Sequence, residues 1–177
     1  MNEAVLSDCG QYRYLLTRRW GPGPTATFTM LNPSTADADT DDPTIRRCIG
    51  FAKSWHCGSL NVVNLFAFRA TDPRELLRVA DPVGPRNDAF LHDYLPGAVA
   101  AWGAHKRAAA RARGVVRAFV RSSPLWCLGV TKDGHPRHPL YVKTDAPLIP
   151  WRTTSPPGPT RSVGSNRERS MPGSRSS

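Results

Sequence analysis

The sequence predicts an α/β protein with a mainly parallel sheet and helices on both of its faces. Short apolar segments of strand-like composition alternate along the chain with segments of helical periodicity, which is typical of strand–helix–strand units. Each strand-like segment is followed by a polar loop. Because ligands bind beyond the carboxyl ends of parallel strands, we expect these loops to gather at one edge of the sheet and to form a site there.

The strands are predicted from short apolar runs. Residues 26–31 are mostly apolar and contain Thr and Phe, which indicates a buried strand, and a Gly-Pro-Gly-Pro turn separates them from the strand-like residues 12–16. Residues 59–66 contain adjacent β-branched side chains and form a second clear strand. Shorter strands are expected at residues 98–102 and 125–130, and a last extended piece at residues 140–142.

Helices are predicted in the segments between these strands. Pro43 suits the first turn of a helix that runs to about residue 55. Asp72 is a candidate N-cap for a short helix that starts at Pro73 and extends to residue 79. Two more helices are expected at residues 85–95 and, in a segment rich in alanine and arginine, at about residues 105–120.

The length and composition favour one domain. Of the 177 residues, residues 1–151 are expected to form a single α/β domain, and residues 152–177, rich in Pro, Ser, Gly and Arg, a disordered tail. The four cysteines form no CxxC pair, and we see no export signal and no apolar run of about eighteen residues. We therefore expect a cytoplasmic protein with free thiols, no membrane association and no cofactor.

The charge of the chain favours an anionic partner. The formal net charge is +10; five arginines and one glutamate from Arg152 onward contribute +4, which leaves +6 for residues 1–151. DNA or a nucleotide is therefore a candidate partner. A basic composition that only aids solubility explains the charge equally well, and the sequence leaves the oligomeric state open.

The segment Asn32-Pro33-Ser34 follows directly on the predicted strand at residues 26–31. Pro33 lacks the N–H that a strand ladder needs, so the strand ends and a loop begins. The amide of Asn32 can face a pocket at the sheet edge, with Pro33 and Ser34 beside it as candidate substrate contacts. The alternative is that Asn32 caps the strand in an Asx turn.

An acid-rich loop comes next and contains Asp37, Asp39, Asp41 and Asp42. Carboxylates can hold a divalent cation, but the spacing does not match that of an EF-hand loop, and we predict no metal site. Capping and solvation account for most of these side chains. One aspartate of the loop, for which Asp37 is our candidate, can activate a water molecule.

Asn64 lies within an otherwise apolar strand, so its amide must find hydrogen-bond partners there. Such an amide is suited to reading the edge of a planar heterocycle, and bonding to neighbouring backbone is an equally good explanation. Phe66 and Phe68 can stack on a base, and Arg69 can contact a phosphate. Core packing is the alternative for Phe66 and is a weaker one for Phe68.

His135, Arg137 and His138 lie together in a loop with turn composition. Two imidazoles and a guanidinium in one turn suit phosphate binding or the stabilisation of a departing anion. As metal ligands the two histidines lack an evident third partner. The sequence contains no Walker loop and no GxSxG, HExxH or GxGxxG motif, which excludes the commonest simple assignments.

Several motifs taken together resemble an uncharacterised, mainly bacterial family, domain of unknown function 1643. They extend from about residue 12 to residue 151 and comprise MLNPSTADADTDDPTIRRCIGFAKSW, NVVNLFAFRATDP, DPVGPRND, AWG and LGVTKDGHPRHPLY. The family name implies no activity.

The order of elements is also distantly similar to the uracil-DNA glycosylase superfamily. This resemblance implies a three-layer α/β/α fold around a short, mainly parallel sheet. It further implies that the Asn32 loop positions water, that Asn64 recognises a base and that a His-Pro loop stabilises the departing base. The sequence HPRHP departs from the HPS ending of the superfamily, so both His135 and His138 are candidates for the last role.

Three hypotheses for the function follow. The first is a uracil-DNA glycosylase-like hydrolase that cuts the N-glycosidic bond of a flipped nucleobase, natural or modified, in DNA. The second is a module with the same fold that binds a nucleotide or nucleic acid without cleaving it. The third, ranked lower, is a metal-dependent phosphohydrolase that uses the aspartates.

Overall fold

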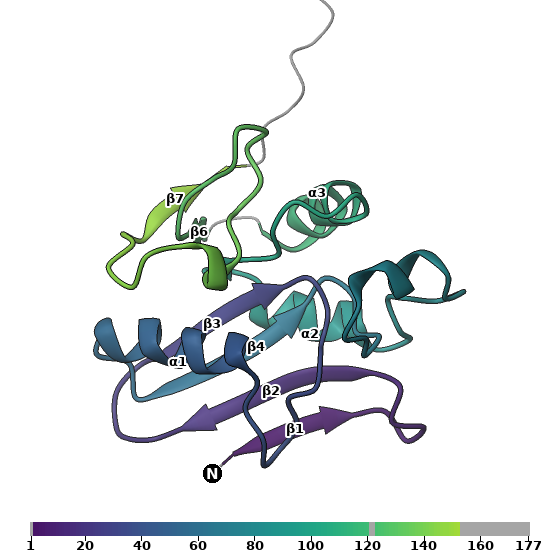
Figure 1. Cartoon of the computed structure of the whole chain (residues 1–177), viewed down its shortest axis with the longest axis horizontal. Helices are drawn as coiled ribbons and strands as arrows, with labels where there is room; N and C mark the ends of the chain where they lie inside the picture. The colour runs from purple at the N-terminus through teal and green to yellow at the C-terminus, as the bar shows by residue number, and fades with distance from the viewer. Residues whose placement is uncertain (1, 121–122, 153–177) are drawn as a thin grey trace, which may run out of the picture.

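The computed structural model describes residues 2–120 and 123–152, and within them a seven-stranded mixed sheet (Figure 1). The strand order is β1-β2-β4-β3-β5-β6-β7. The strands are β1 (Glu3–Leu6), β2 (Arg13–Arg19), β3 (Thr25–Met30), β4 (Ser59–Asn64), β5 (Val99–Ala100), β6 (Leu125–Cys127) and β7 (Ile149–Trp151). The tail predicted to be disordered lies outside the described residues, apart from Arg152 at its start.

The sheet is longer and more mixed than the sequence predicted. Strands β4, β3, β5 and β6 are parallel to one another, whereas the pairs β1–β2, β2–β4 and β6–β7 are antiparallel. The α/β class is confirmed, and the expectation of a short sheet is wrong. The physical reason is that β1, β2 and β7 continue the backbone hydrogen bonding on both sides of the parallel strands. Of these three strands, only β2 was predicted from the sequence.

Helices cover both faces of the sheet. Helix α1 (Pro43–Ser54) lies on one face, and α2 (Asn87–Tyr94) and α3 (Ala108–Phe119) lie on the other (Figure 1). All three were predicted, with ends that differ by a few residues, as was the short helix η1 (Pro73–Leu77) with its Asp72 cap. Among the helices of the described segments, none has the length and apolar character needed to cross a membrane.

The predicted extended piece at residues 140–142 is wrong in part. Residues Pro139–Tyr141 form a single turn of 3-10 helix, η2. Pro139 occupies the first helical position, and the His138 side chain accepts a hydrogen bond from the Leu140 N–H as an N-cap. A proline preceded by a capping side chain starts a helix, and this signal outweighed the strand-like side chains of the segment.

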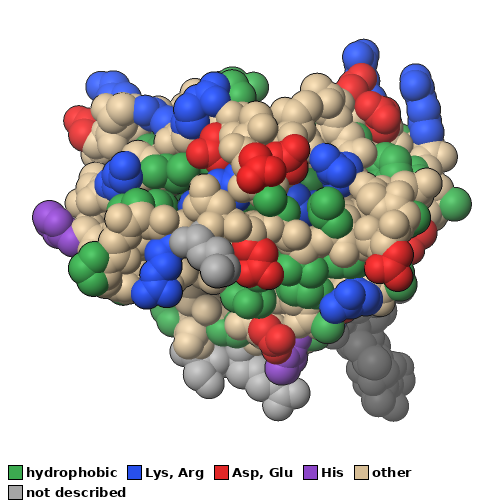
Figure 2. Space-filling view, turned by 90° about the horizontal axis from the view of Figure 1, so that it is seen from below, with side chains coloured by type: hydrophobic (Ala, Val, Ile, Leu, Met, Phe, Trp, Pro, Cys, Tyr) green, Lys and Arg blue, Asp and Glu red, His purple; other side chains and the backbone are tan. Residues whose placement is uncertain are grey.

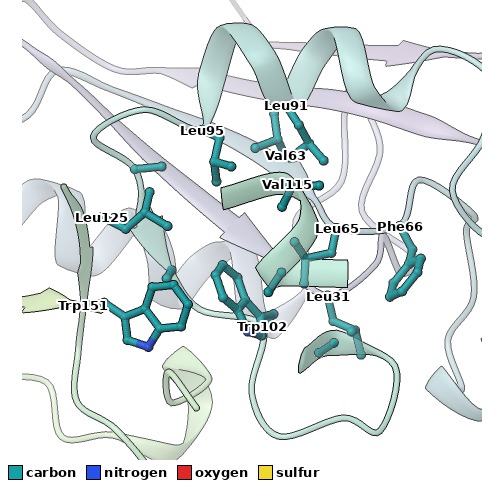
Figure 3. Packing of buried hydrophobic residues seen from close by; sticks show 14 of the residues in the cluster. Leu31, Val63, Leu65, Phe66, Leu91, Leu95, Trp102, Val115, Leu125 and Trp151 are labelled. Carbon is teal, nitrogen blue, oxygen red and sulfur yellow. The ribbon is translucent and has the colours of Figure 1, made fainter. Parts of the chain in front are cut away.

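Two hydrophobic cores hold the helices on the sheet. The α1-side core contains Phe51 of α1, together with Leu60 and Val62 of β4. The α2-side core contains the side chains that Figure 3 labels, among them Leu91, Leu95, Val63 and Val115. Along β4 the side chains alternate between the two cores, as the period of a strand requires.

The strand order reverses at β3. From β3 the chain passes through α1 to β4 on one side, and it later returns to β5 on the other side of β3. The connections that follow β3 and β5 therefore leave the sheet toward opposite faces, and a crevice opens between them at the carboxyl end of β3. Open α/β sheets bind their ligands at such a position.

Candidate functional site

A pocket of about 360 Å³ opens at the carboxyl ends of β3, β4 and β5, where the strand order reverses. Small-molecule sites span roughly 300–1,000 Å³, so this pocket suits a compact ligand. Its lining comes from the strand ends, the loops after them, the first turn of α1 and the segment around η2. The charged and amide side chains and one of the histidines among the lining residues are Arg13, Asn32, Asp42, Asn64 and His138.

Four of the candidate residues that the sequence singled out line this pocket, and they come from three separate segments of the chain. They are Asn32, Ser34, Asn64 and His138. The other candidates do not line it: Pro33, Asp37, Phe66, Phe68, Arg69, His135 and Arg137. The sequence therefore identified the right edge of the sheet, but not every side chain that reaches the pocket.

Asn64 is the most unusual of these residues. Its residue exposure is 1%, and neither its amide nitrogen nor its amide oxygen has a hydrogen-bond partner in the described structure. The strand alternation places it on the α1 face together with Val62, which also lines the pocket. A buried amide without partners costs about 1–3 kcal/mol per unsatisfied group, so a partner from outside the chain is expected here.

Asn32 is partly committed to the structure of the loops. Its Nδ2 donates hydrogen bonds to the main-chain carbonyls of Pro33 at 2.9 Å and Ala70 at 2.8 Å. The bond to Ala70 joins the loop after β3 to the loop after β4. The bonds are not those of the Asx turn considered as the alternative, in which the Oδ1 would accept from a main-chain N–H. Within the described residues its Oδ1 accepts no hydrogen bond, so this oxygen is the atom that can serve a ligand or water. Pro33 is buried, outside the pocket.

The aspartates of the acid-rich loop have separate roles. The Asp37 carboxylate accepts hydrogen bonds from the Asp39 and Thr40 N–H groups, which lower its pKa, and it lies outside the pocket. Asp41 pairs with Arg18 at 2.8 Å. Asp42 lines the pocket, so Asp42 is better placed than Asp37 to activate water there.

Asp42 also begins α1. Its Oδ1 accepts a hydrogen bond of 2.8 Å from the Ile45 N–H, which makes it the N-cap of the helix. Its second carboxylate oxygen accepts no hydrogen bond from the described residues. In the described part of the chain, no group of three or more His, Cys, Asp or Glu side chains is arranged to hold a metal ion.

Of the two histidines in the His-Pro loop, the structure brings His138 to the pocket. Its Nδ1 accepts a hydrogen bond from the Leu140 N–H at 3.3 Å, so in the neutral ring the proton is on Nε2. Burial lowers the pKa of His138, and the nearby Asp42 carboxylate opposes this shift. His135 lies outside the pocket, and Arg137, which is exposed, donates from Nε to the Val130 carbonyl at 3.2 Å.

The two phenylalanines and Arg69 lie beside the pocket rather than in it. Phe66 is buried in the α2-side core, as the packing alternative foresaw (Figure 3). Phe68 and Arg69 line a second depression of about 370 Å³, which we call the side groove. The side groove shares Ser34, Ala70 and Thr71 with the pocket, so the two hollows adjoin along a common wall.

Sequence reasoning missed Arg13, which lines the pocket from β2. The pairing of β2 with β1 skips one residue, Tyr14, and so forms a β-bulge. Tyr14 stacks on Phe90 of α2, and its neighbour Leu15 belongs to the α2-side core. Two adjacent side chains thus share one face, and Arg13 is turned to the α1 face. The available sign of a functional residue was an arginine next to apolar residues in a strand. Strict alternation along the strand would place Arg13 on the α2 face, with Leu15, and so away from the pocket.

Arg13 is 2% exposed, and its Nη1 donates to the main-chain carbonyl of Ala36. Burial lowers its pKa to about 10, and the Asp42 carboxylate acts in the opposite direction, so the guanidinium is charged at neutral pH. His105, whose pKa is also lowered by burial, and the buried Trp102 are further lining residues that the sequence did not single out.

Comparison with known proteins gives a family and no activity. The model of a family described as protein of unknown function, DUF1643, matches residues 13–140. Neither a curated protein nor a solved structure matches the chain. The matched range includes the pocket residues discussed above, among them Arg13, Asn32, Ser34, Asp42, Asn64 and His138. Because the match covers well over half of the 177 residues, the protein belongs to the DUF1643 family.

Proposed function

We propose that this protein binds a nucleobase in the pocket and hydrolyses its N-glycosidic bond, as a uracil-DNA glycosylase-like hydrolase acting on DNA. The observation that carries the proposal is Asn64, a buried amide at the pocket with neither polar atom bonded in the described structure. A carboxamide offers two donors and one acceptor in a plane. The hydrogen-bonding edge of a nucleobase presents the complementary planar groups.

The reaction would use three further side chains of the pocket. Heterolysis of the bond between the sugar C1′ and the base nitrogen leaves the electron pair on the base, while a water oxygen adds to C1′. Asp42 would accept the proton of this water through its unbonded carboxylate oxygen, and the Asn32 Oδ1 would orient the same water. The Nε2–H of neutral His138 would donate to the departing base, a stabilisation worth about 3–4 kcal/mol by analogy with an oxyanion-hole donor.

The side groove provides a place for the strand that carries the base. It contains Arg69, whose Nη1 donates to the Gly10 carbonyl at 3.2 Å and whose Nε has no partner in the described structure. Phosphate oxygens are the natural acceptors for such a donor. On the face that Figure 2 shows, basic and acidic side chains are intermixed, and the described part of that face has no continuous basic surface. We therefore propose that the DNA strand follows the side groove.

An abasic-site assay tests the proposal. Single-stranded and duplex oligonucleotides carrying natural and modified bases are incubated with the protein, and strand cleavage at abasic sites is scored after alkali treatment. We expect one class of base to be released, and Asn64→Ala to slow its release by about 10²–10³-fold, the loss typical of one preorganised polar contact. Asn61→Ala is the matched control, because Asn61 belongs to the same strand, bonds Thr17 and does not line the pocket.

Two outcomes would contradict the proposal. One is that no base in the panel is released under any condition in which the protein is folded. The other is that release occurs and Asn64→Ala cleaves as fast as Asn61→Ala, because the pocket would then have no part in the reaction.

A second candidate is a module that binds the base without cleaving it. The observation that favours it is that both water-positioning candidates also cap backbone: Asn32 bonds two carbonyls and Asp42 caps α1. Saturable nucleotide binding that depends on Asn64, without base release, would select this function. The aspartates do not converge on one point in the described residues, so no observation favours a metal-dependent phosphohydrolase.

A further inference from the structure

We propose that Arg13 forms an oxyanion subsite inside the pocket, so that the ligand of this protein is a phosphorylated nucleoside. The identity of the nucleoside part rests on the proposed function. The oxyanion subsite itself does not, since it concerns what the pocket binds and holds whether or not a glycosidic bond is cut.

The Arg13 guanidinium has donors that the described residues do not use. A guanidinium carries five N–H groups, and the Arg13 side chain makes one hydrogen bond to the described residues, from Nη1 to the Ala36 carbonyl. Its Nε is buried and has no partner there. Since the residue is only 2% exposed, its guanidinium is poorly solvated, and an acceptor bound in the pocket that Arg13 lines would supply the missing hydrogen bonds.

The charge of Arg13 is not neutralised by an ion pair within the described residues. The described residues form four ion pairs, and Arg13 takes part in none of them. Among the described residues, Asp42 is the one that brings a carboxylate to the pocket, and one of its oxygens is held by the first turn of α1. Asp42 therefore helps to keep Arg13 charged without occupying its donors. A phosphate group presents two oxygens whose spacing matches the N–H groups of a guanidinium. Phosphate can therefore accept two parallel hydrogen bonds from an arginine, which a single-atom anion cannot.

Other hydrogen-bonding groups line the pocket together with Arg13. The hydroxyl side chains of Ser34, Thr44 and Thr71 line the same hollow and can complete the hydrogen bonding of a phosphate. Thr44 belongs to the first turn of the twelve-residue helix α1, whose positive dipole end adds to the attraction for an anion. The base-reading amide of Asn64 lines the pocket as well, so a single small ligand can reach both.

A purely structural role for Arg13 is distinguished by comparison with Arg18. Arg18 lies on the same strand, is 3% exposed and reaches the same loop. Each of its three guanidinium nitrogens, however, donates to a partner: Nε pairs with Asp41 at 2.8 Å, and the other two donate to the carbonyls of Asp37 and Thr17. Arg18 does not line the pocket. An arginine that only fastens the loop would look like Arg18, and Arg13 does not.

The test measures equilibrium binding by calorimetry on the full chain at one fixed ionic strength. The probes are inorganic phosphate, the natural nucleosides, their 5′-monophosphates, and a short single-stranded oligonucleotide without terminal phosphates. We expect at least one monophosphate to bind about tenfold or more tightly than its nucleoside, since a charge-assisted hydrogen bond contributes at least that factor. Arg13→Gln should bring this ratio close to one, whereas the matched variant Arg18→Gln should keep it.

The oligonucleotide shows where the phosphate comes from. Competition between the oligonucleotide and inorganic phosphate would place the oxyanion in a nucleic acid strand, and competition by monophosphates alone would place it in a free nucleotide; both support the subsite. Equal affinity of every nucleoside and its monophosphate for the wild-type protein would overturn the proposal. An unchanged ratio in Arg13→Gln would overturn it as well.

The proposal stays testable if Arg13→Gln does not fold, because the nucleoside-to-monophosphate ratio of the wild-type protein and of Arg18→Gln decides it. Its failure is also separable from that of the proposed function. Phosphate binding without the release of any base would contradict the glycosylase and support the subsite. Base release by a protein that binds monophosphates no better than nucleosides would do the reverse.

Discussion

The side chain of Asn87 donates two hydrogen bonds to the main chain around Asn64, one to the carbonyl of Asn64 itself at 3.0 Å and one to that of Leu65 at 3.1 Å. Asn87 is fully buried at the first residue of α2. It therefore fixes the end of β4 from one face of the sheet, while the Asn64 amide lies on the other face at the pocket. The backbone that carries the proposed base-reading residue is held by a second asparagine.

Replacement of Asn87 should destabilise the fold. Asn87→Ala removes both of these hydrogen bonds, although the Leu65 carbonyl keeps a second donor, the Nε of Arg111 at 3.0 Å. We predict a loss of about 1–3 kcal/mol in the free energy of unfolding, because two buried bonds are lost. Urea denaturation followed by circular dichroism measures it. Asn61→Ala, which removes one half-buried side-chain bond, should cost less. Equal urea midpoints for Asn87→Ala and the wild-type protein would show that these two bonds do not hold β4.

The two roles of Asp42 can be separated by substitution. Asparagine is as good an N-cap as aspartate, so Asp42→Asn should keep the stability of α1, whereas Asp42→Ala should lose about 0.5–2 kcal/mol. An amide cannot accept a proton from water, so Asp42→Asn should lower the rate of base release as strongly as Asp42→Ala does. Thermal unfolding and the abasic-site assay on both variants measure the two effects. Full activity in Asp42→Asn would remove Asp42 from the chemistry and leave it as a cap.

The burial of His138 predicts a pH dependence of stability. Its pKa is lowered in the folded protein by burial, so between the ordinary value near 6.5 and the lower folded value the unfolded chain binds more protons. The contribution of this residue is therefore complete above about pH 6.5, the unfolded value, and declines as the pH falls below it. We predict that His138→Gln flattens the fall in stability between about pH 7 and pH 5.

Urea unfolding at a series of pH values for the wild-type protein and His138→Gln measures this difference. The opposite result is a wild-type protein that becomes more stable relative to His138→Gln as the pH falls. This result would contradict the prediction, because it would mean that a carboxylate partner, and not burial, dominates the pKa of folded His138.

Two glycines test the packing of the fold in opposite directions. Gly50 lies in the exposed surface of α1 with no atom within 4 Å of an added Cβ, so Gly50→Ala should stabilise the protein by about 1 kcal/mol through helix propensity. At Gly58 an added Cβ would clash with the main-chain carbonyl oxygen of Pro22. Gly58→Ala should therefore lower the melting temperature, because the backbone of the turn before β3 must shift. A melting temperature for Gly58→Ala at or above that of the wild type would contradict this packing.

The local elements were predictable because their signals are local. Pro43 begins α1, and Pro73 begins η1 with Asp72 as its cap, as the sequence indicated. That Asp42 caps α1 agrees with the capping expected of most aspartates in the acid-rich loop. The convergence of the loops after β3, β4 and β5 follows from the parallel arrangement of these strands, which the alternation of strands and helices predicted. This is why Asn32 and Asn64, far apart in sequence, line one pocket.

The parts that could not be predicted depend on long-range pairing. Nothing in residues 13–19 shows that β2 pairs antiparallel with β4, or that a bulge at Tyr14 turns Arg13 to the pocket. The choice between His135 and His138 likewise depends on how the loop after β6 folds back, which brings the Arg137 N–H to the Gly129 carbonyl at 2.9 Å. Short-range periodicity contains no information on either arrangement.

The Asn64 amide, which has no hydrogen-bond partner among the described residues, is proposed to receive a nucleobase, and the side-chain amide resonance of Asn64 tests this most directly. The protein is labelled with nitrogen-15, the Asn64 and Asn61 side-chain signals are assigned by comparing Asn64→Ala and Asn61→Ala, and free bases, nucleosides and nucleotides are titrated in turn. We predict that one class of ligand shifts the Asn64 signal saturably and leaves the Asn61 signal in place. An Asn64 signal that no ligand of the panel moves would contradict the claim.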